Sequence, residues 1–123
     1  MIALRFAIRA VVMVLGLGLL SQHAIAGQTA THSFSGMCAY YSESGKVASG
    51  GRFNPNGLTA AHRSLPFGTR VRVTDPKSGR SVIVTINDRG PFNKGRVIDV
   101  SLAAARVLGM IGHGIMFVRA EIL

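Results

Sequence analysis

Cysteine and carboxylate side chains are scarce in this sequence, and their scarcity excludes several kinds of site. One cysteine among 123 residues rules out a disulfide within the chain. No His or Cys spacing resembles a metal site, and the chain has neither a serine nucleophile elbow nor a glycine motif that cradles phosphate. We therefore expect no metal and no cofactor. Five acidic residues stand against 14 basic ones, and this balance indicates an anionic partner.

The first 26 residues have the features of a signal peptide. Arg5 and Arg9 precede an apolar run over residues 10–20, and residues 24–26 have the small-x-small pattern of a cleavage site. The apolar run is shorter than the roughly 20 residues that cross a bilayer, so we expect cleavage and no transmembrane segment afterwards. The mature chain would keep 12 basic and five acidic residues, a net charge of +7. Export argues against nucleic acid and favours a cell-wall polymer or an anionic membrane surface.

The mature chain is predicted to be one mainly β domain. Residues 27–35 are small and polar and are predicted to form a flexible lead, and residues 36–123 are predicted to form the domain. Strands are expected over residues 37–42, 70–74, 80–86, 96–100 and 115–122. The turn at residues 75–79 makes the second and third of these a hairpin. Several short strands without long helical crossovers favour a small closed barrel.

Two further segments complete the expected order of elements. Residues 101–108 are predicted to form a helix, with Ser101 as its N-cap and Gly109 just past its end. Residues 58–63 fit either a helical turn or a short strand. Residues 43–56, dense in Gly, Ser, Asn and Pro, are predicted to form a long irregular loop, and such loops often carry function.

Asp88 is the acidic residue best placed for chemistry. It follows an apolar strand and lies in a stiff turn sequence, although Asp is also a common turn former. Asp75 lies in a Pro-Gly turn, and Asp99 is expected to be buried and bonded to backbone amides. Glu43 and Glu121 have the context of solvated residues. Cleavage of a glycosidic bond needs a proton donor, and Asp or Glu usually serves.

His62 is the second candidate, between the glycine-rich loop and a Leu-Pro-Phe sequence. A hydrogen-bonded structural histidine is the alternative reading. Cys38 is expected to be a small buried residue in a strand.

Three ordered motifs resemble one known family. Residues 58–69 (LTAAHRSLPFGT), 86–92 (INDRGPF) and 95–101 (GRVIDVS) are similar to rare lipoprotein A, and the likeness runs from about residue 36 to the C-terminus. It implies a six-stranded double-psi β-barrel with one or two short helices, as in expansins. It also implies endolytic lytic transglycosylase activity on peptidoglycan glycan strands without stem peptides. In such a reaction the 6-hydroxyl of N-acetylmuramic acid (MurNAc) attacks its own C1, and the bond to N-acetylglucosamine (GlcNAc) breaks without water.

The resemblance also assigns roles to individual residues. Asp88 corresponds to the acid and base, and His62 to its partner. One carboxylate can fill both roles in turn, which suits a chain with so few of them. The positions expected to contact or orient the sugar are Thr59, Asn87, Arg89 and a stacking ring from Tyr41 or Tyr40.

One departure from the family pattern leaves alternatives open. Many members have an acidic residue in the loop where this chain has Gly51. A non-catalytic, expansin-like module that binds peptidoglycan is therefore the main alternative, and an exported inhibitor or toxin-like protein is a further one. In each case we expect a monomer in the periplasm or cell envelope.

Overall fold

The computed structural model describes residues 32–42 and 47–123. The predicted signal peptide, residues 27–31 of the lead and Glu43 lie outside the described residues. Residues 33–123 form one compact unit. Within the described part of the chain, no helix has the length and apolar character needed to cross a membrane.

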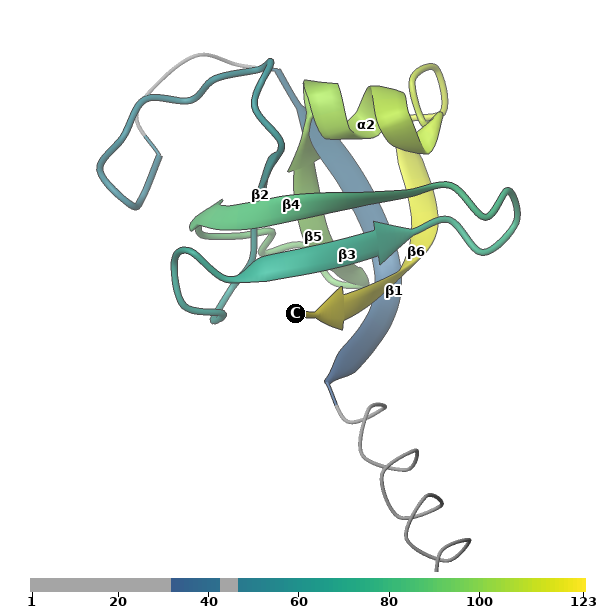
Figure 1. Ribbon diagram of the computed structural model, residues 1–123, viewed down its shortest axis with the longest axis horizontal. Coiled ribbons are helices and arrows are strands. Elements are labelled where there is room, and N and C mark those ends of the chain that lie inside the picture. The colour runs from purple at the N-terminus through teal and green to yellow at the C-terminus, as the bar shows by residue number, and fades with distance from the viewer. Residues whose placement is uncertain (1–31, 43–46) are drawn as a thin grey trace, which may run out of the picture. The chain divides into compact units, whose positions relative to one another are not determined.

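Six strands form a closed barrel (Figure 1). In chain order they are β1 (Ser33–Tyr41), β2 (Thr59–Ala61), β3 (Arg70–Thr74), β4 (Ser81–Asp88), β5 (Arg96–Ser101) and β6 (Ile115–Ile122). Around the barrel their order is β1-β5-β2-β4-β3-β6. The β1–β5 and β2–β4 pairs are parallel and the other four are antiparallel. The mainly β, closed-barrel prediction is confirmed.

The barrel interior is filled by small and branched apolar side chains from alternating strand positions. In β4, Val82, Val84 and Ile86 are buried while the residues between them are partly exposed. Cys38 from β1 is also fully buried, as expected, and β3 contributes Val71. Since strand side chains alternate between faces, one face of each strand supplies the core and the other meets solvent.

Helix α2 (Leu102–Leu108) closes one side of the barrel and has the predicted caps. Ser101 Oγ accepts a hydrogen bond from the Ala104 amide, and Gly109 adopts the left-handed conformation (φ 72°) just past the helix end. The hairpin of β3 and β4 also lies where the sequence indicated. The ambiguous segment over residues 58–63 contains a strand, β2, rather than a helical turn.

Two predicted boundaries were wrong. Strand β1 begins at Ser33, so residues 33–35, predicted to belong to the lead, pair with β6 instead. Ser33 and Ser35 resemble a linker because they are exposed, whereas Phe34 packs partly against the core. Strand β4 extends through Asn87 and Asp88, which were expected in a turn, because parallel pairing with β2 continues the ladder beyond the apolar residues.

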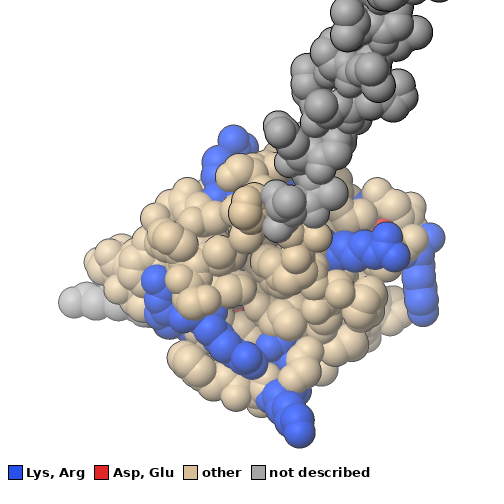
Figure 2. All heavy atoms as spheres, turned by 90° about the horizontal axis from the view of Figure 1, so that it is seen from below, with Lys and Arg blue, Asp and Glu red and all other residues tan. Residues whose placement is uncertain are grey.

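The surface carries mainly positive charge. Figure 2 shows Lys and Arg side chains in several separate groups on one face, with little acidic surface among them. Such a surface attracts polyanions through its overall field rather than through one concentrated patch.

Candidate active site

A bulge in strand β4 sets the position of Asp88. Ala60 of β2 pairs with Ile86, but the next residue, Ala61, pairs with Asp88, so Asn87 is the extra residue. A bulge of this kind bends the strand and re-aims the following side chain, and bulges are common beside active sites. Asp88 is therefore held at the end of a rigid barrel strand.

The carboxylate of Asp88 is anchored through one oxygen only. Its Oδ1 accepts hydrogen bonds from the backbone amides of Ala48, at 2.8 Å, and Arg89, at 2.9 Å. Among the described residues, Oδ2 has no hydrogen-bond partner and no Lys or Arg forms an ion pair with Asp88. One oxygen thus fixes the group, while the other is available to a ligand.

The other three described carboxylates all have side-chain partners. These are the Ser78 hydroxyl at 2.7 Å for Asp75, the Arg96 guanidinium for Asp99, and the Arg72 guanidinium at 3.8 Å for Glu121. The prediction that Asp99 bonds to backbone amides was wrong, because Arg96 lies three residues earlier on the same strand and pairs with it. Among the described acidic residues, Asp88 is the one that has no side-chain partner and keeps one carboxylate oxygen unbonded.

The loop before β2 is tied to the strand that carries Asp88. Besides the Ala48 contact, the Ser49 amide donates to the Asn87 carbonyl at 3.1 Å. At the other end of the loop, the buried Ser101 hydroxyl donates to the Gly57 carbonyl at 2.6 Å. The sequence predicted the loop but not these bonds, since backbone amides have no sequence signature.

His62 is held as a neutral ring. Its Nδ1 accepts hydrogen bonds from the backbone amides of Ser64 and Leu65, both at 3.1 Å. A nitrogen that accepts two N–H groups carries no proton, so the ring proton is on Nε2. Burial lowers the pKa of His62 below 6.5, and the positive charges of Arg89 and Arg63 lower it further. His62 is thus a hydrogen-bond donor through Nε2, and its amide also bonds to the Asp88 carbonyl at 3.1 Å.

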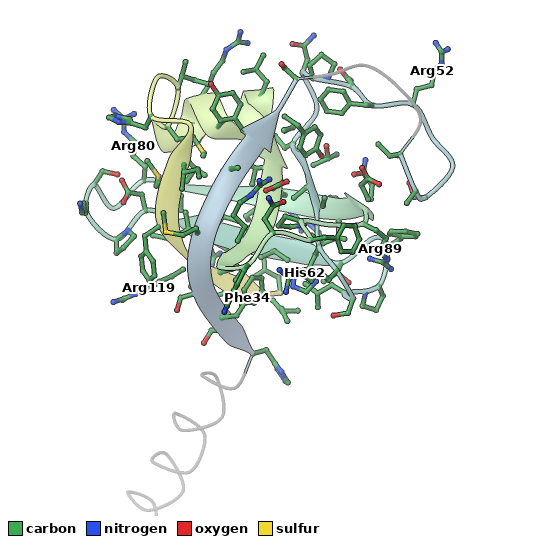
Figure 3. The ribbon with its side chains drawn as sticks, turned by 180° about the vertical axis from the view of Figure 1, so that it is seen from behind. Phe34, Arg52, His62, Arg80, Arg89 and Arg119 are labelled. Atoms are coloured by element: carbon green, nitrogen blue, oxygen red, sulfur yellow. The ribbon has the colours of Figure 1, made fainter. Side chains whose placement is uncertain are left out.

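Arg89 braces the neighbouring loop and does not pair with Asp88. Its guanidinium donates to the carbonyls of His62, at 3.2 Å, and Leu65, at 2.7 Å, and lies over the ring of Phe67 at 3.9 Å. Figure 3 shows His62 and Arg89 on one side of the barrel and Arg80 on the other. Arg52 points away from the body.

Three buried polar atoms near Asp88 lack hydrogen-bond partners among the described residues. They are the Tyr41 hydroxyl, the Thr59 hydroxyl and Asn87 Oδ1. Burial raises the pKa of Tyr41; the Thr59 hydroxyl beside it acts in the opposite sense, and the charges of Asp88 and Asp99 raise it further. The Tyr41 ring packs on Phe53, with centroids 4.7 Å apart. An unpaired buried polar group is costly and calls for an explanation, of which a catalytic or binding role is one.

Three other features of the described residues were weaker candidates for a functional site. A cavity of about 590 Å³ lies away from Asp88, between the β3–β4 turn and the start of β6, and its one carboxylate, Asp75, already bonds within the turn. Burial raises the pKa of the Cys38 thiol to about 12, so this cysteine is not a nucleophile. No group of three or more His, Cys, Asp or Glu able to hold a metal occurs in the described ranges.

Comparison with known proteins identifies the family. A family model described as lytic transglycolase matches residues 33–120, which include strands β1 to β5 and most of β6. This chain belongs to the lytic transglycolase family. The family recognised from the sequence motifs is confirmed.

Curated relatives of this lytic transglycolase domain have concordant names. One from Nostoc sp., "Probable endolytic peptidoglycan transglycosylase RlpA", is 62% identical over 74% of this chain and 26% of its own length. Another from Pasteurella multocida, "Endolytic peptidoglycan transglycosylase RlpA", is 55% identical over 63% of this chain and 26% of its own. The chain thus spans between about a quarter and a third of the length of the curated relatives it matches.

Solved structures agree with the double-psi β-barrel fold. The Streptomyces papain inhibitor aligns with a TM-score of 0.63 at 21% identity, over 78% of this chain and 97% of its own. A Clavibacter michiganensis expansin in its apo form aligns with a TM-score of 0.59 at 25% identity, over 74% of this chain and 50% of its own.

Proposed function

We propose that this domain is an endolytic lytic transglycosylase of peptide-free peptidoglycan glycan strands, with Asp88 acting first as acid and then as base. The observation that carries the proposal is the state of the Asp88 carboxylate. Its Oδ1 is fixed by two backbone amides, while Oδ2 has no partner among the described residues. The names of relatives at 62% and 55% identity support the same reaction.

In the first step, protonated Asp88 gives its proton through Oδ2 to the glycosidic oxygen. The bond between C1 of MurNAc and that oxygen breaks, GlcNAc leaves as an alcohol, and C1 is left with the positive charge of an oxocarbenium-like centre. Asp88 is now a carboxylate, stabilised by the amides of Ala48 and Arg89. Hydrogen bonds from backbone N–H to a charged oxygen are the stronger kind, so this product state is favoured.

In the second step, the Asp88 carboxylate takes the proton of the MurNAc 6-hydroxyl. The oxygen so released bonds to C1 and closes a 1,6-anhydro ring. The carboxyl group regains its proton, no water is consumed, and no second carboxylate is required. A reaction that needs one carboxylate fits a site in which one described acidic side chain has an oxygen without a hydrogen-bond partner.

The other polar groups of the site bind the sugar or position the residues that do. His62 would donate a hydrogen bond from Nε2 to a sugar oxygen, because its Nδ1 is occupied. Thr59, Asn87 and Tyr41 would orient Asp88 or the sugar through the buried atoms that lack partners. Arg89 acts by bracing the loop that carries His62.

Mass spectrometry of digests tests the proposal. Residues 27–123 are incubated with amidase-treated, peptide-free peptidoglycan, in parallel with Asp88→Asn and with Asp75→Asn as a carboxylate control. Products ending in 1,6-anhydroMurNAc from the wild type and Asp75→Asn, and none from Asp88→Asn, are expected. Reducing ends in place of anhydro ends would indicate hydrolysis and contradict the mechanism.

A non-catalytic, expansin-like wall module is the second candidate. Gly51 favours it, because this loop position carries no acidic group. Glycan binding without any products from the wild type would support that candidate. With either function, we propose a monomeric protein in the periplasm or cell envelope.

A further inference from the structure

The most exposed large apolar side chain of the described residues lies in the turn that follows Asp88. Phe92 has 79% of its surface exposed. Its ring lies beside Gly90, where a Cβ would be 3.6 Å from the ring edge. An isolated exposed apolar residue needs no explanation. Phe92 differs because the segment that presents it is rigidly held.

Arg63 fixes that segment. Its guanidinium group donates hydrogen bonds to the carbonyls of Pro91, of Asn93, at 2.9 Å, and of Arg96, at 3.0 Å. The two residues on either side of Phe92 are thus bound to one side chain. A ring on a fixed backbone loses little further entropy when a ligand covers it, so its contact area converts efficiently into affinity.

A second exposed ring lies on the loop between β2 and β3. Phe67 is 43% exposed, and the guanidinium of Arg89 covers one face of its ring. The loop is bonded to β4 next to the bulge, since the Gly68 amide donates to the Ile86 carbonyl at 2.8 Å and the Ile86 amide to the Thr69 carbonyl at 2.8 Å. Phe67 is therefore tied to the same strand end as Asp88.

We propose that Phe92 and Phe67 form an aromatic platform on which the glycan strand stacks as it passes Asp88. The proposal rests on the proposed function. Phe92 follows Asp88 by four residues in one turn, and Phe67 contacts Arg89, the residue after Asp88. Arg63 and Arg89 are positioning residues, because backbone carbonyls occupy their guanidinium groups.

A glycan fits this surface better than other partners do. The ring C–H groups of a pyranose form an apolar face, while its hydroxyl groups lie at the edge, so a sugar can cover an exposed phenyl ring and remain solvated. The two rings belong to segments that also carry the proposed site, since the His62 amide bonds to the Asp88 carbonyl and Arg89 bonds to the carbonyls of His62 and Leu65. A protein or membrane partner would instead cover the carboxylate and block the reaction.

Two measurements on three variants test the platform. Phe92→Ala and Phe67→Ala are compared with Phe117→Ala, whose ring is 46% exposed but lies on β6. Co-sedimentation with insoluble peptide-free glycan gives affinity, and release of anhydro ends gives KM and kcat. We expect about tenfold weaker binding and a similar rise in KM for each platform variant, the loss of about 1.4 kcal/mol of uniform binding. We expect kcat to change less than about twofold, and Phe92→Trp to restore binding.

The outcomes separate this inference from the proposed reaction. If the wild type forms no anhydro ends but Phe92→Ala still weakens glycan binding, the platform stands and the catalytic proposal fails. If both platform variants melt like the wild type and bind glycan as tightly, the platform is refuted. An equal loss of binding in Phe117→Ala would also refute it, since contact would then not be confined to the Asp88 end.

Discussion

Replacing Asp88 by two different residues separates its anchoring role from its chemistry. Oδ1 accepts hydrogen bonds from the Ala48 and Arg89 amides, whereas the proposed reaction needs a titratable Oδ2. Asparagine keeps an acceptor oxygen for both amides but has no acidic proton. Alanine removes the acceptor and leaves the amides of Ala48 and Arg89 without this partner.

The expected magnitudes follow from those two bonds. Each is worth about 1 to 1.5 kcal/mol net, so Asp88→Ala should lower the free energy of unfolding by roughly 2 to 3 kcal/mol. In a domain of this size 1 kcal/mol shifts Tm by about 4–8 °C, so Tm should fall by at least about 8 °C. Asp88→Asn should cost less than about 1 kcal/mol, because one acceptor serves both amides.

Thermal melts followed by circular dichroism, with anhydro-end release measured on the same samples, check this prediction. Both variants should be inactive, and only the alanine variant should be strongly destabilised. Equal destabilisation of the two would show that Asp88 matters for its charge in the fold rather than for its acceptor oxygen. Activity in Asp88→Asn would refute its role as acid and base.

Three further predictions concern the surroundings of Asp88. Gly51→Glu should raise the rate of anhydro-end release, because a Cβ at this position meets nothing within 4 Å and the loop is bonded to Asp88. Arg52→Glu is the control and should leave the rate unchanged, because the Arg52 side chain points away from the barrel. The lowered pKa of His62 means that the folded state favours the neutral ring, so its contribution to the free energy of unfolding should be fully present above pH 6.5 and be lost as the pH falls through the lowered pKa. NMR titration of the histidine and urea unfolding near pH 7 and pH 5 measure this contribution. A His62 pKa above 6.5 would contradict the prediction. Ser101→Ala should cost about 1–2 kcal/mol in urea unfolding, since this fully buried hydroxyl caps α2 and bonds to the loop; no loss would show that water replaces it.

Much of the barrel could be predicted from local patterns. The alternation in β4, the turn at Asp75 and the caps at Ser101 and Gly109 are short-range features, and the structure has each of them. The errors in strand boundaries occurred where pairing with a strand distant in the sequence determines where a strand begins or ends. Ser33 joins β1 because it pairs with Glu121.

For the candidate site, too, some features could be predicted from the sequence and others depended on long-range contacts. Motif spacing singled out Asp88 and His62, and their backbones do meet across the β2–β4 pair. The sequence did not indicate that Arg89 bonds to carbonyls of the neighbouring loop rather than to Asp88. It also gave no sign that Phe92 is exposed, because the exposure of a side chain depends on which segments pack around it.

The family, the mainly β character, the caps and turns, and the few residues able to transfer a proton could all be inferred from residue order alone. Each of these depends on residue type and on neighbours close along the chain. The folded barrel was needed to show which oxygen of Asp88 is free, which ring nitrogen of His62 carries the proton and which aromatic rings remain exposed. Those properties depend on backbone amides and carbonyls, which every residue has, and on which of them the closed barrel brings together.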